Sequence, residues 1–213
     1  MADILPRTVT VEADGVSLPG DLAIPEPAIS VVVFAHGSGS SRRSPRNVRV
    51  AERLQADGLG TLLFDLLTDD EAGDRDKVFD IALLARRLEG AVGWLQREPD
   101  AGQLPMAFFG ASTGAAAALV AAGHLESDVA AVVSRGGRPD LAGDALEAVT
   151  APSLLIVGGE DLQVLELNRQ ARGHLRCETR LEIVPGATHL FEEPGALERV
   201  AELAAAWFTS HVG

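Results

Sequence analysis

The stretch Pro105–His124, PMAFFGASTGAAAALVAAGH, decides how the rest of the chain is interpreted. An apolar run, Met106–Phe109, leads into GASTG at 110–114, and an alanine-rich run without proline follows. This order predicts a buried strand, a sharp turn with Ser112 at its apex, and a helix. The pattern G-x-S-x-G in that context is typical of a nucleophile elbow, whose strained turn lifts the serine hydroxyl clear of the sheet. The flanking glycines are expected where strand and helix pass too close for a Cβ atom.

The same turn has a second interpretation, in which Ser112 is only a helix cap. A nucleophile needs partner residues, and the strands and helices predicted on either side of it show where these can lie. Predicted strands lie at 30–35, 61–66, 106–109, 129–134, 153–157 and 179–184, after a hairpin formed by 8–12 and 16–24. Predicted helices lie at 47–57, 78–97, 140–149, 165–175 and 195–211, with a polar, acidic loop over 67–76. Phe79 is placed on the apolar face of the 78–97 helix.

The alternation of strands and helices predicts an α/β fold with a mostly parallel sheet. The hairpin gives that sheet an antiparallel start, and helices are expected on both of its faces. The chain has 213 residues, of which 46% are hydrophobic, so we expect one domain over 1–213 with a substantial core.

Composition excludes several function classes. The net charge of −13 argues against binding to nucleic acid or to an anionic membrane surface. Apolar stretches end well short of the ~20 residues that a membrane span needs. The first residues, MADILPRTVT, lack the pattern of a secretory signal. The single cysteine, Cys177, excludes an internal disulfide, and together these features predict a cytoplasmic protein.

Ligands of such sheets bind at the carboxyl ends of the strands, so the turns after strands are where chemistry is expected. A serine nucleophile needs a base within hydrogen-bond reach, and the base needs a carboxylate that fixes its tautomer. Ser112, Asp161 and His189 each follow a predicted strand and supply these groups in the order Ser…Asp…His. That is the chain order of an α/β-hydrolase catalytic triad. Asp161 is preferred over its neighbour Glu160, and Asp65 is expected to order loops.

The chain resembles the α/β-hydrolases, and among them the small, capless dienelactone hydrolase-like members. The resemblance rests on HGSGS at 36–40, GASTG at 110–114, the GGED turn at 158–161 and GATHLFEEPG at 186–195, and it covers nearly the whole chain. It implies a serine hydrolase that cleaves a small ester, thioester or lactone through an acyl-enzyme on Ser112. Founding members carry a cysteine at the elbow, so Ser112 favours a general serine esterase over lactone hydrolysis of the founding kind.

The oxyanion hole of such an enzyme needs two N–H groups aimed at the developing charge. The backbone N–H groups of Thr113 and Ser38 are assigned to it, and the side chain of Thr113 is expected to be replaceable. Gly37 and Gly39 allow close backbone approach and are candidate substrate-binding residues.

Arg135 follows the strand beside the elbow and is a further candidate for binding substrate. Its guanidinium either reaches the pocket and pairs with a substrate carboxylate, or it bridges loops or pairs with Asp161 or Asp140. His36 is expected to hold its loop through backbone hydrogen bonds. The other arginines nearby, Arg42, Arg43, Arg46 and Arg49, are expected to be solvated, although Arg42 is close enough to the His36 loop to matter.

Competing interpretations of the His36 loop fail on spacing. Arg42 stands where a dinucleotide-binding loop needs its third glycine, and no G-K-[ST] sequence indicates a phosphate-binding loop. No histidine or cysteine spacing predicts a metal site, so neither metal nor cofactor is expected. The expected partner is a small-molecule substrate, and the oligomeric state stays open. Two functions remain as alternatives: an acyltransferase or perhydrolase using the same acyl-enzyme, and a catalytically silent binding module on the same fold.

Overall fold

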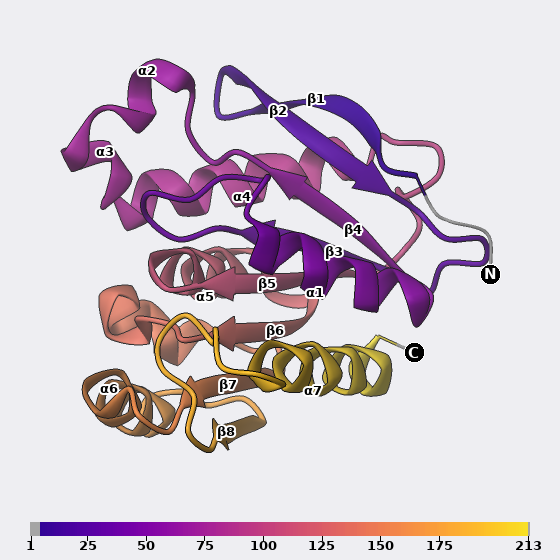
Figure 1. Ribbon diagram of the computed structural model, residues 1–213. Helices are drawn as coiled ribbons and strands as arrows, with labels where there is room; N and C mark the ends of the chain where they lie inside the picture. The colour runs from indigo at the N-terminus through magenta and orange to yellow at the C-terminus, as the bar shows by residue number, and fades with distance from the viewer. Residues whose placement is uncertain (1–4, 213) are drawn as a thin grey trace.

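An eight-stranded sheet runs through the molecule in the order β1-β2-β4-β3-β5-β6-β7-β8 (Figure 1). The computed structural model describes residues 5–212. The strands are β1 (Arg7–Ala13), β2 (Val16–Ala23), β3 (Ser30–Ala35), β4 (Leu59–Phe64), β5 (Met106–Ala111), β6 (Val129–Arg135), β7 (Ser153–Gly158) and β8 (Thr179–Val184). β2 pairs antiparallel with both β1 and β4, and the remaining pairs are parallel. The predicted fold class, a mostly parallel sheet with an antiparallel N-terminal hairpin, is therefore confirmed.

Helices cover both faces of this sheet, as the sequence predicted (Figure 1). They are α1 (Pro45–Ala56), α2 (Asp69–Ala72), α3 (Arg75–Val78), α4 (Ile81–Leu95), α5 (Thr113–Leu125), α6 (Leu162–Arg172) and α7 (Ala196–His211), with 3₁₀ helices η1 (Glu126–Asp128) and η2 (Pro139–Ala148). α1 and α7 pack on one face in one core cluster, while α4 and α5 pack on the other face in a second cluster. Because β3, β5, β6 and β7 run parallel to one another, their carboxyl ends lie at the same edge of the sheet.

The acidic stretch at 67–76, predicted as a loop, contains two short helices instead. α2 begins with a capping box, in which the side chains of Thr68 and Glu71 each accept a hydrogen bond from the other's backbone N–H. α3 is capped by Asp74, the residue before it, whose carboxylate accepts from the N–H of Asp76 at 3.0 Å. Side-chain capping bonds stabilise these helical turns, although the sequence there has no apolar periodicity that would predict a helix.

Other predicted boundaries also shift, among them those of α1 and α6, which begin two and three residues earlier than predicted. The strand predicted at 61–66 spans Leu59–Phe64, and the helix predicted at 140–149 is the 3₁₀ segment η2, interrupted at Gly143. α4 begins at Ile81 because Asp80 caps it, accepting from the N–H of Leu83 at 2.9 Å. Phe79 therefore lies outside the helix and is 48% exposed, so its placement on the apolar face was wrong.

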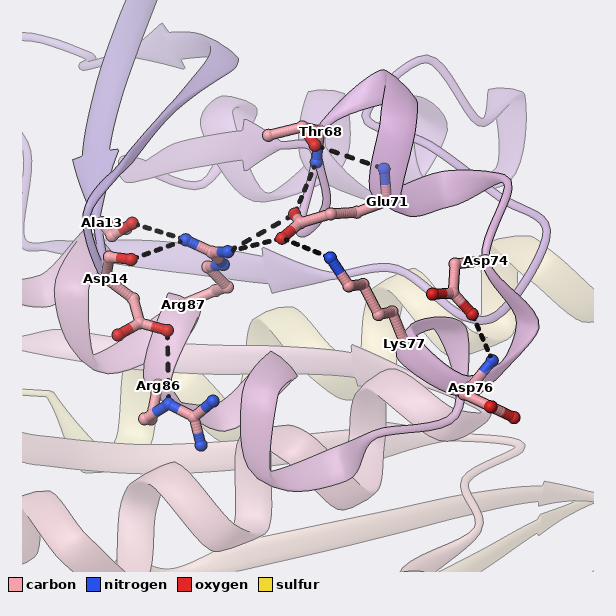
Figure 2. Close-up of polar contacts among 9 residues, drawn as sticks. All are labelled: Ala13, Asp14, Thr68, Glu71, Asp74, Asp76, Lys77, Arg86 and Arg87. Atoms are coloured by element: carbon pink, nitrogen blue, oxygen red, sulfur yellow. Dashed lines mark hydrogen bonds and ion pairs between the residues drawn. The ribbon is translucent and has the colours of Figure 1, made fainter.

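Arg87, on α4, fastens the α2 segment to the N-terminal hairpin (Figure 2). Its side chain is 3% exposed, and Nη1 donates to the carbonyl oxygens of Ala13 at 2.8 Å and Asp14 at 3.0 Å. Nη2 donates to both carboxylate oxygens of Glu71, at 3.1 and 3.3 Å. Lys77 approaches the same carboxylate at 3.5 Å. One buried guanidinium thus fixes a segment that lines the cavity described below.

Among residues 5–212, no helix combines the length and the apolar character that crossing a bilayer requires.

Candidate active site

Ser112 occupies the turn between β5 and α5 with a strained backbone, φ 52° and ψ −121°. Residues other than glycine rarely adopt these backbone angles. The conformation costs ~1–3 kcal/mol and persists only where the surrounding structure enforces it. Here a Cβ at Gly110 would overlap the backbone of Ala115, and one at Gly114 would overlap the carbonyl oxygen of Ala35. The hydroxyl of Ser112 makes no capping bond to α5, so the helix-cap interpretation does not hold.

A carboxylate–histidine pair stands at the same edge of the sheet. Nδ1 of His189 lies 2.6 Å from Oδ2 of Asp161. Asp161 directly precedes α6, but its side chain makes no capping bond there and turns to the imidazole instead. This contact fixes Nδ1 as the protonated nitrogen and leaves Nε2 as an acceptor. The two loops are held together by the N–H of Glu160, which donates to the carbonyl oxygen of Ala187 at 3.0 Å.

Ser112 and His189 approach each other through the end of β6. The N–H of Ser112 donates to the carbonyl oxygen of Arg135 at 3.3 Å. The next residue, Gly136, lies against the imidazole: a Cβ atom placed on it would be 3.6 Å from Cε1 of His189. The structure contains no hydrogen bond between the Ser112 hydroxyl and the imidazole. The serine turn and the carboxylate–histidine pair are therefore neighbours around one short backbone segment.

The loop after β3 packs directly against the serine turn. A Cβ at Gly37 would lie 3.1 Å from Cβ of Ser112, while Gly39 has φ +69° and faces open space. The N–H of Ser38 donates to Oγ1 of Thr113 at 2.9 Å. The N–H group predicted to belong to the oxyanion hole is therefore bonded to the Thr113 side chain, which was expected to be replaceable.

His36 and Asp65 hold the loops around this edge. Nε2 of His36 accepts from the N–H of Leu66 at 3.1 Å, so Nδ1 carries the proton and donates to the carbonyl oxygen of Gly37, also at 3.1 Å. Burial lowers the pKa of His36, which keeps this ring neutral. Asp65 accepts from the N–H of Arg42 at 2.7 Å and pairs with its guanidinium. The loop-holding roles expected for His36 and Asp65 are confirmed, whereas the expectation that Arg42 is solvated was wrong.

A cavity of about 300 Å³ opens beside the loop after β3. Its lining comes from that loop, the turn after β4, the α2–α3 segment and α4: His36, Gly37, Ser38, Gly39, Ser40, Ser41, Asp65, Leu66, Leu67, Asp69, Ala72, Val78 and Leu84. Neither Ser112 nor His189 lines it. Gly37 and Ser38 connect the two places, since both residues line the cavity and both pack against the serine turn.

Arg135 is buried, and neither of the pairings foreseen for it is present. Asp161 faces His189, and Asp140 receives two hydrogen bonds from Arg138, at 2.8 and 2.7 Å. Within residues 5–212, Nε and Nη1 of Arg135 have no hydrogen-bond partner. Burial, together with the charge of Arg46, lowers the pKa of Arg135 to about 10. The predicted pairing of Arg135 with Asp161 or Asp140 is therefore wrong.

No cluster of three or more histidine, cysteine, aspartate or glutamate side chains suited to a metal ion occurs in the part of the chain that the structure describes.

The sheet order, the serine turn and the carboxyl-edge histidine define an α/β-hydrolase fold. A dienelactone hydrolase from Anabaena variabilis is 55% identical, with a TM-score of 0.93 over 97% of this chain and 99% of that one. The chain belongs to the dienelactone hydrolase-like family of α/β-hydrolases. Est1E from Butyrivibrio proteoclasticus superposes with a TM-score of 0.82 over 96% of this chain and 98% of that one, at 17% identity, and supports the fold.

Longer relatives contain this chain as a part. Two Mycobacterium tuberculosis proteins named as phosphoribosyl transferases are 59% identical over 204 residues, which is 96% of this chain and 46% of their own length. The chain thus spans about half the length of the curated relatives it matches. No protein-family model matches the chain.

Proposed function

We propose that this chain is a serine hydrolase that cleaves a small ester, thioester or lactone through an acyl-enzyme on Ser112. The observation that carries the proposal is the strained turn of Ser112 beside a His189–Asp161 pair at 2.6 Å. A backbone conformation this unfavourable is typical of functional positions, where it aims a side chain. The dienelactone hydrolase from Anabaena variabilis, which matches over nearly its whole length, supports the same class of reaction.

In the proposed mechanism, Nε2 of His189 takes the proton of the Ser112 hydroxyl as Oγ attacks the substrate carbonyl. The new Oγ–C bond yields a tetrahedral intermediate, and the bond to the leaving oxygen or sulfur breaks as His189 returns the proton to it. Water then attacks the acyl-enzyme with His189 again as base, and the C–Oγ bond breaks to release the acid and restore Ser112. Asp161 orients the imidazole and stabilises its charged form throughout.

The oxyanion of this intermediate would accept from the backbone N–H groups of Thr113 and Ser38. In the unliganded molecule the Ser38 N–H is already bound to Thr113 Oγ1. A charged oxygen is a stronger acceptor than a neutral hydroxyl, so the developing oxyanion takes over this donor in the transition state. Gly37 and Gly39 leave room for the carbonyl, and the 300 Å³ cavity receives one side of a small substrate.

The Mycobacterium tuberculosis proteins named as phosphoribosyl transferases match this chain over 46% of their length, so their name does not indicate which reaction this part supports. Two alternative functions differ from the hydrolase in what happens to the acyl-enzyme. An acyltransferase or perhydrolase would use the same acyl-enzyme with an acceptor other than water, and a silent binding module would form none.

Hydrolysis of p-nitrophenyl acetate and labelling with a fluorophosphonate probe test the proposal. Wild type should turn over and become labelled, whereas Ser112→Ala should lose labelling and nearly all turnover. Ser127→Ala, at an exposed serine in η1, is the matched control and should behave as wild type. Absence of both turnover and labelling in wild type would refute the hydrolase. Labelling with turnover that depends on an added alcohol or peroxide would point to the transferase.

A further inference from the structure

The face of α6 that packs on the core contains one polar side chain. The buried residues of this helix are Val164, Leu165, Asn168 and Ala171, and the exposed fraction of Asn168 is 0%. Helical periodicity favours an apolar residue at that position. Oδ1 of Asn168 has no hydrogen-bond partner among residues 5–212. Burying an amide with one end unpaired is unfavourable, so a role for its other end is expected.

That other end holds the loop that follows β6. Nδ2 of Asn168 donates to the carbonyl oxygen of Val164 at 2.8 Å, one turn earlier in the same helix. It also donates to the carbonyl oxygen of Gly137 at 2.9 Å, across 31 positions of the chain. Both neighbours are acceptors, so the amide faces them with Nδ2 and not with Oδ1. The second bond joins α6 to a separate segment of the chain.

Gly137 packs against β6 and α5 as closely as a backbone can. A Cβ atom placed on it would overlap Oγ of Ser134 and would lie 2.7 Å from Cβ of Ala115. Only glycine fits there, so the loop backbone lies directly on these two elements. Its carbonyl oxygen is bound by α6 at the same time. The loop therefore has a defined position, which depends on Asn168.

The residues on either side of Gly137 contact the two halves of the proposed site. Gly136 lies against the imidazole of His189, as described above. The N–H of Arg138 donates to the carbonyl oxygen of Ser112 at 3.1 Å. Gly137 is thus the middle residue of a short segment that extends from the histidine to the strained serine turn. The position of this segment sets the separation of the two groups.

α6 also begins at the third group of the site. Asp161 is the N-cap residue of this helix, and its Oδ2 lies 2.6 Å from Nδ1 of His189. Asn168 follows two helical turns later, ~10 Å further along the helix axis. One helix therefore holds the carboxylate–histidine pair at its first turn and the loop beside Ser112 at its second.

We propose that Asn168 is a positioning residue of the hydrolase: its bond to Gly137 fixes how far the Ser112 hydroxyl lies from Nε2 of His189. The inference rests on the proposed function and adds a residue that touches neither the substrate nor the reacting atoms. Proton transfer requires hydrogen-bond reach, and a misplacement of about 1 Å costs on the order of 10²-fold in rate. Asn168 does not line the cavity beside the loop after β3, so its loss should slow the reaction without weakening substrate binding.

The first test removes the donor with Asn168→Leu, which keeps the branched shape of the side chain. In hydrolysis of p-nitrophenyl acetate, kcat per fluorophosphonate-labelled site should fall about 10–100-fold. KM should stay within about threefold, because acylation and deacylation both pass a proton between Ser112 and His189 and slow together. All rates are measured well below the Tm of each variant.

Leu95→Ala is the matched control for lost stability. It removes a fully buried side chain at the last residue of α4, so it should lower Tm while kcat stays at the wild-type value. Wild-type kcat in Asn168→Leu, with only a lower Tm, would show that Asn168 stabilises the fold and nothing more. That result would overturn the proposal.

A second variant, Asn168→Asp, makes the donor depend on pH. A protonated carboxyl can donate one hydrogen to the carbonyl oxygen of Gly137, whereas a carboxylate cannot donate and repels that oxygen. The ratio of wild-type kcat to variant kcat should therefore widen as the pH rises from 6 to 9, because a buried carboxyl ionises late. A packing role alone would not produce this pH profile. Wild-type kcat in Asn168→Asp at pH 9 would contradict the proposal.

A third measurement needs no turnover, so it separates failure of this inference from failure of the hydrolase. The N–H groups of Gly136 and Arg138 donate to backbone carbonyl oxygens at 2.8 and 3.1 Å, and these bonds protect them from hydrogen exchange. Their exchange should become about tenfold faster or more in Asn168→Leu, and much less so in Leu95→Ala. Unchanged exchange in Asn168→Leu would overturn the positioning role. Faster exchange in a chain that hydrolyses no ester would refute the hydrolase alone.

Discussion

The hydroxyl of Thr113 accepts a hydrogen bond of 2.9 Å from the backbone N–H of Ser38. The bond joins the first residue of α5 to the loop after β3, across 75 positions of the chain. Thr113 is 4% exposed, so this contact is shielded from solvent. It sets where the Ser38 N–H stands relative to Ser112 before any substrate is bound.

Thr113→Val keeps the shape of the side chain and removes the acceptor. We expect kcat to fall about tenfold and stability to fall by ~1 kcal/mol, because the loop loses its tether and a shielded N–H loses its partner. Thr113→Ser keeps the hydroxyl and should stay within about threefold of wild type, a difference of under ~1 kcal/mol. Steady-state kinetics and chemical denaturation measure both effects. A valine variant with wild-type kcat would restore the view that only the backbone of Thr113 matters.

Asp161 and its neighbour Glu160 provide a matched pair. Asp161→Asn should lower kcat by on the order of 10³–10⁴-fold, since an amide no longer holds His189 in the tautomer with Nε2 free. Glu160→Gln, at an exposed side chain, should have little effect. Ester hydrolysis across a range of pH measures both variants. A larger loss of kcat in Glu160→Gln than in Asp161→Asn would identify Glu160 as the carboxylate that orients His189.

Much of this molecule could be predicted because the central strands β3, β4, β5 and β7 are continuous buried runs. Ser30–Ala35 and Thr179–Val184 were predicted to the residue, since β-branched side chains and flanking turns define them. The turns after the strands could be predicted as well, because a parallel sheet brings its carboxyl ends to one edge. The pairing of Asp161 with His189 follows from that rule.

What could not be predicted depends on contacts between distant segments or on local caps. The α2–α3 segment has no apolar period, and its helices depend on the side chains of Thr68, Glu71 and Asp74. A capping box is visible in the sequence at Thr68–Glu71, so this miss was avoidable. The bond from Ser38 to Thr113 and the unpaired state of Arg135 carry no sequence signal, because each is decided by what the fold places nearby.

The Glu71–Arg87 contact makes the α2 segment sensitive to acid. Burial by itself would raise the pKa of Glu71, but the Thr68 N–H and the charges of Arg87 and Lys77 outweigh it, so the pKa lies below the ordinary value of 4.5. A carboxyl whose pKa is lowered by folding adds stability above its unfolded pKa, and this is lost as the pH falls through the folded value. We therefore expect Glu71→Gln to have a lower Tm than wild type at pH 7, with the gap closing below pH 4.5. A gap that persists unchanged at pH 3 would show that the charge of Glu71 is not what holds α2.

Two glycines of α4 should respond to alanine in opposite directions. A Cβ at Gly90 would lie 2.7 Å from Cβ of Ala13 and 2.8 Å from its Cα, where α4 crosses the hairpin. Gly90→Ala should therefore destabilise the fold by ~1–3 kcal/mol through overpacking. At Gly93 the nearest atom, Nη1 of Arg97, is 3.9 Å away, so Gly93→Ala should stabilise by ~0.5–1 kcal/mol because alanine restricts the unfolded chain and favours helix. Denaturation of the two variants side by side measures the difference, and equal effects would mean that α4 does not pack on β1 this closely.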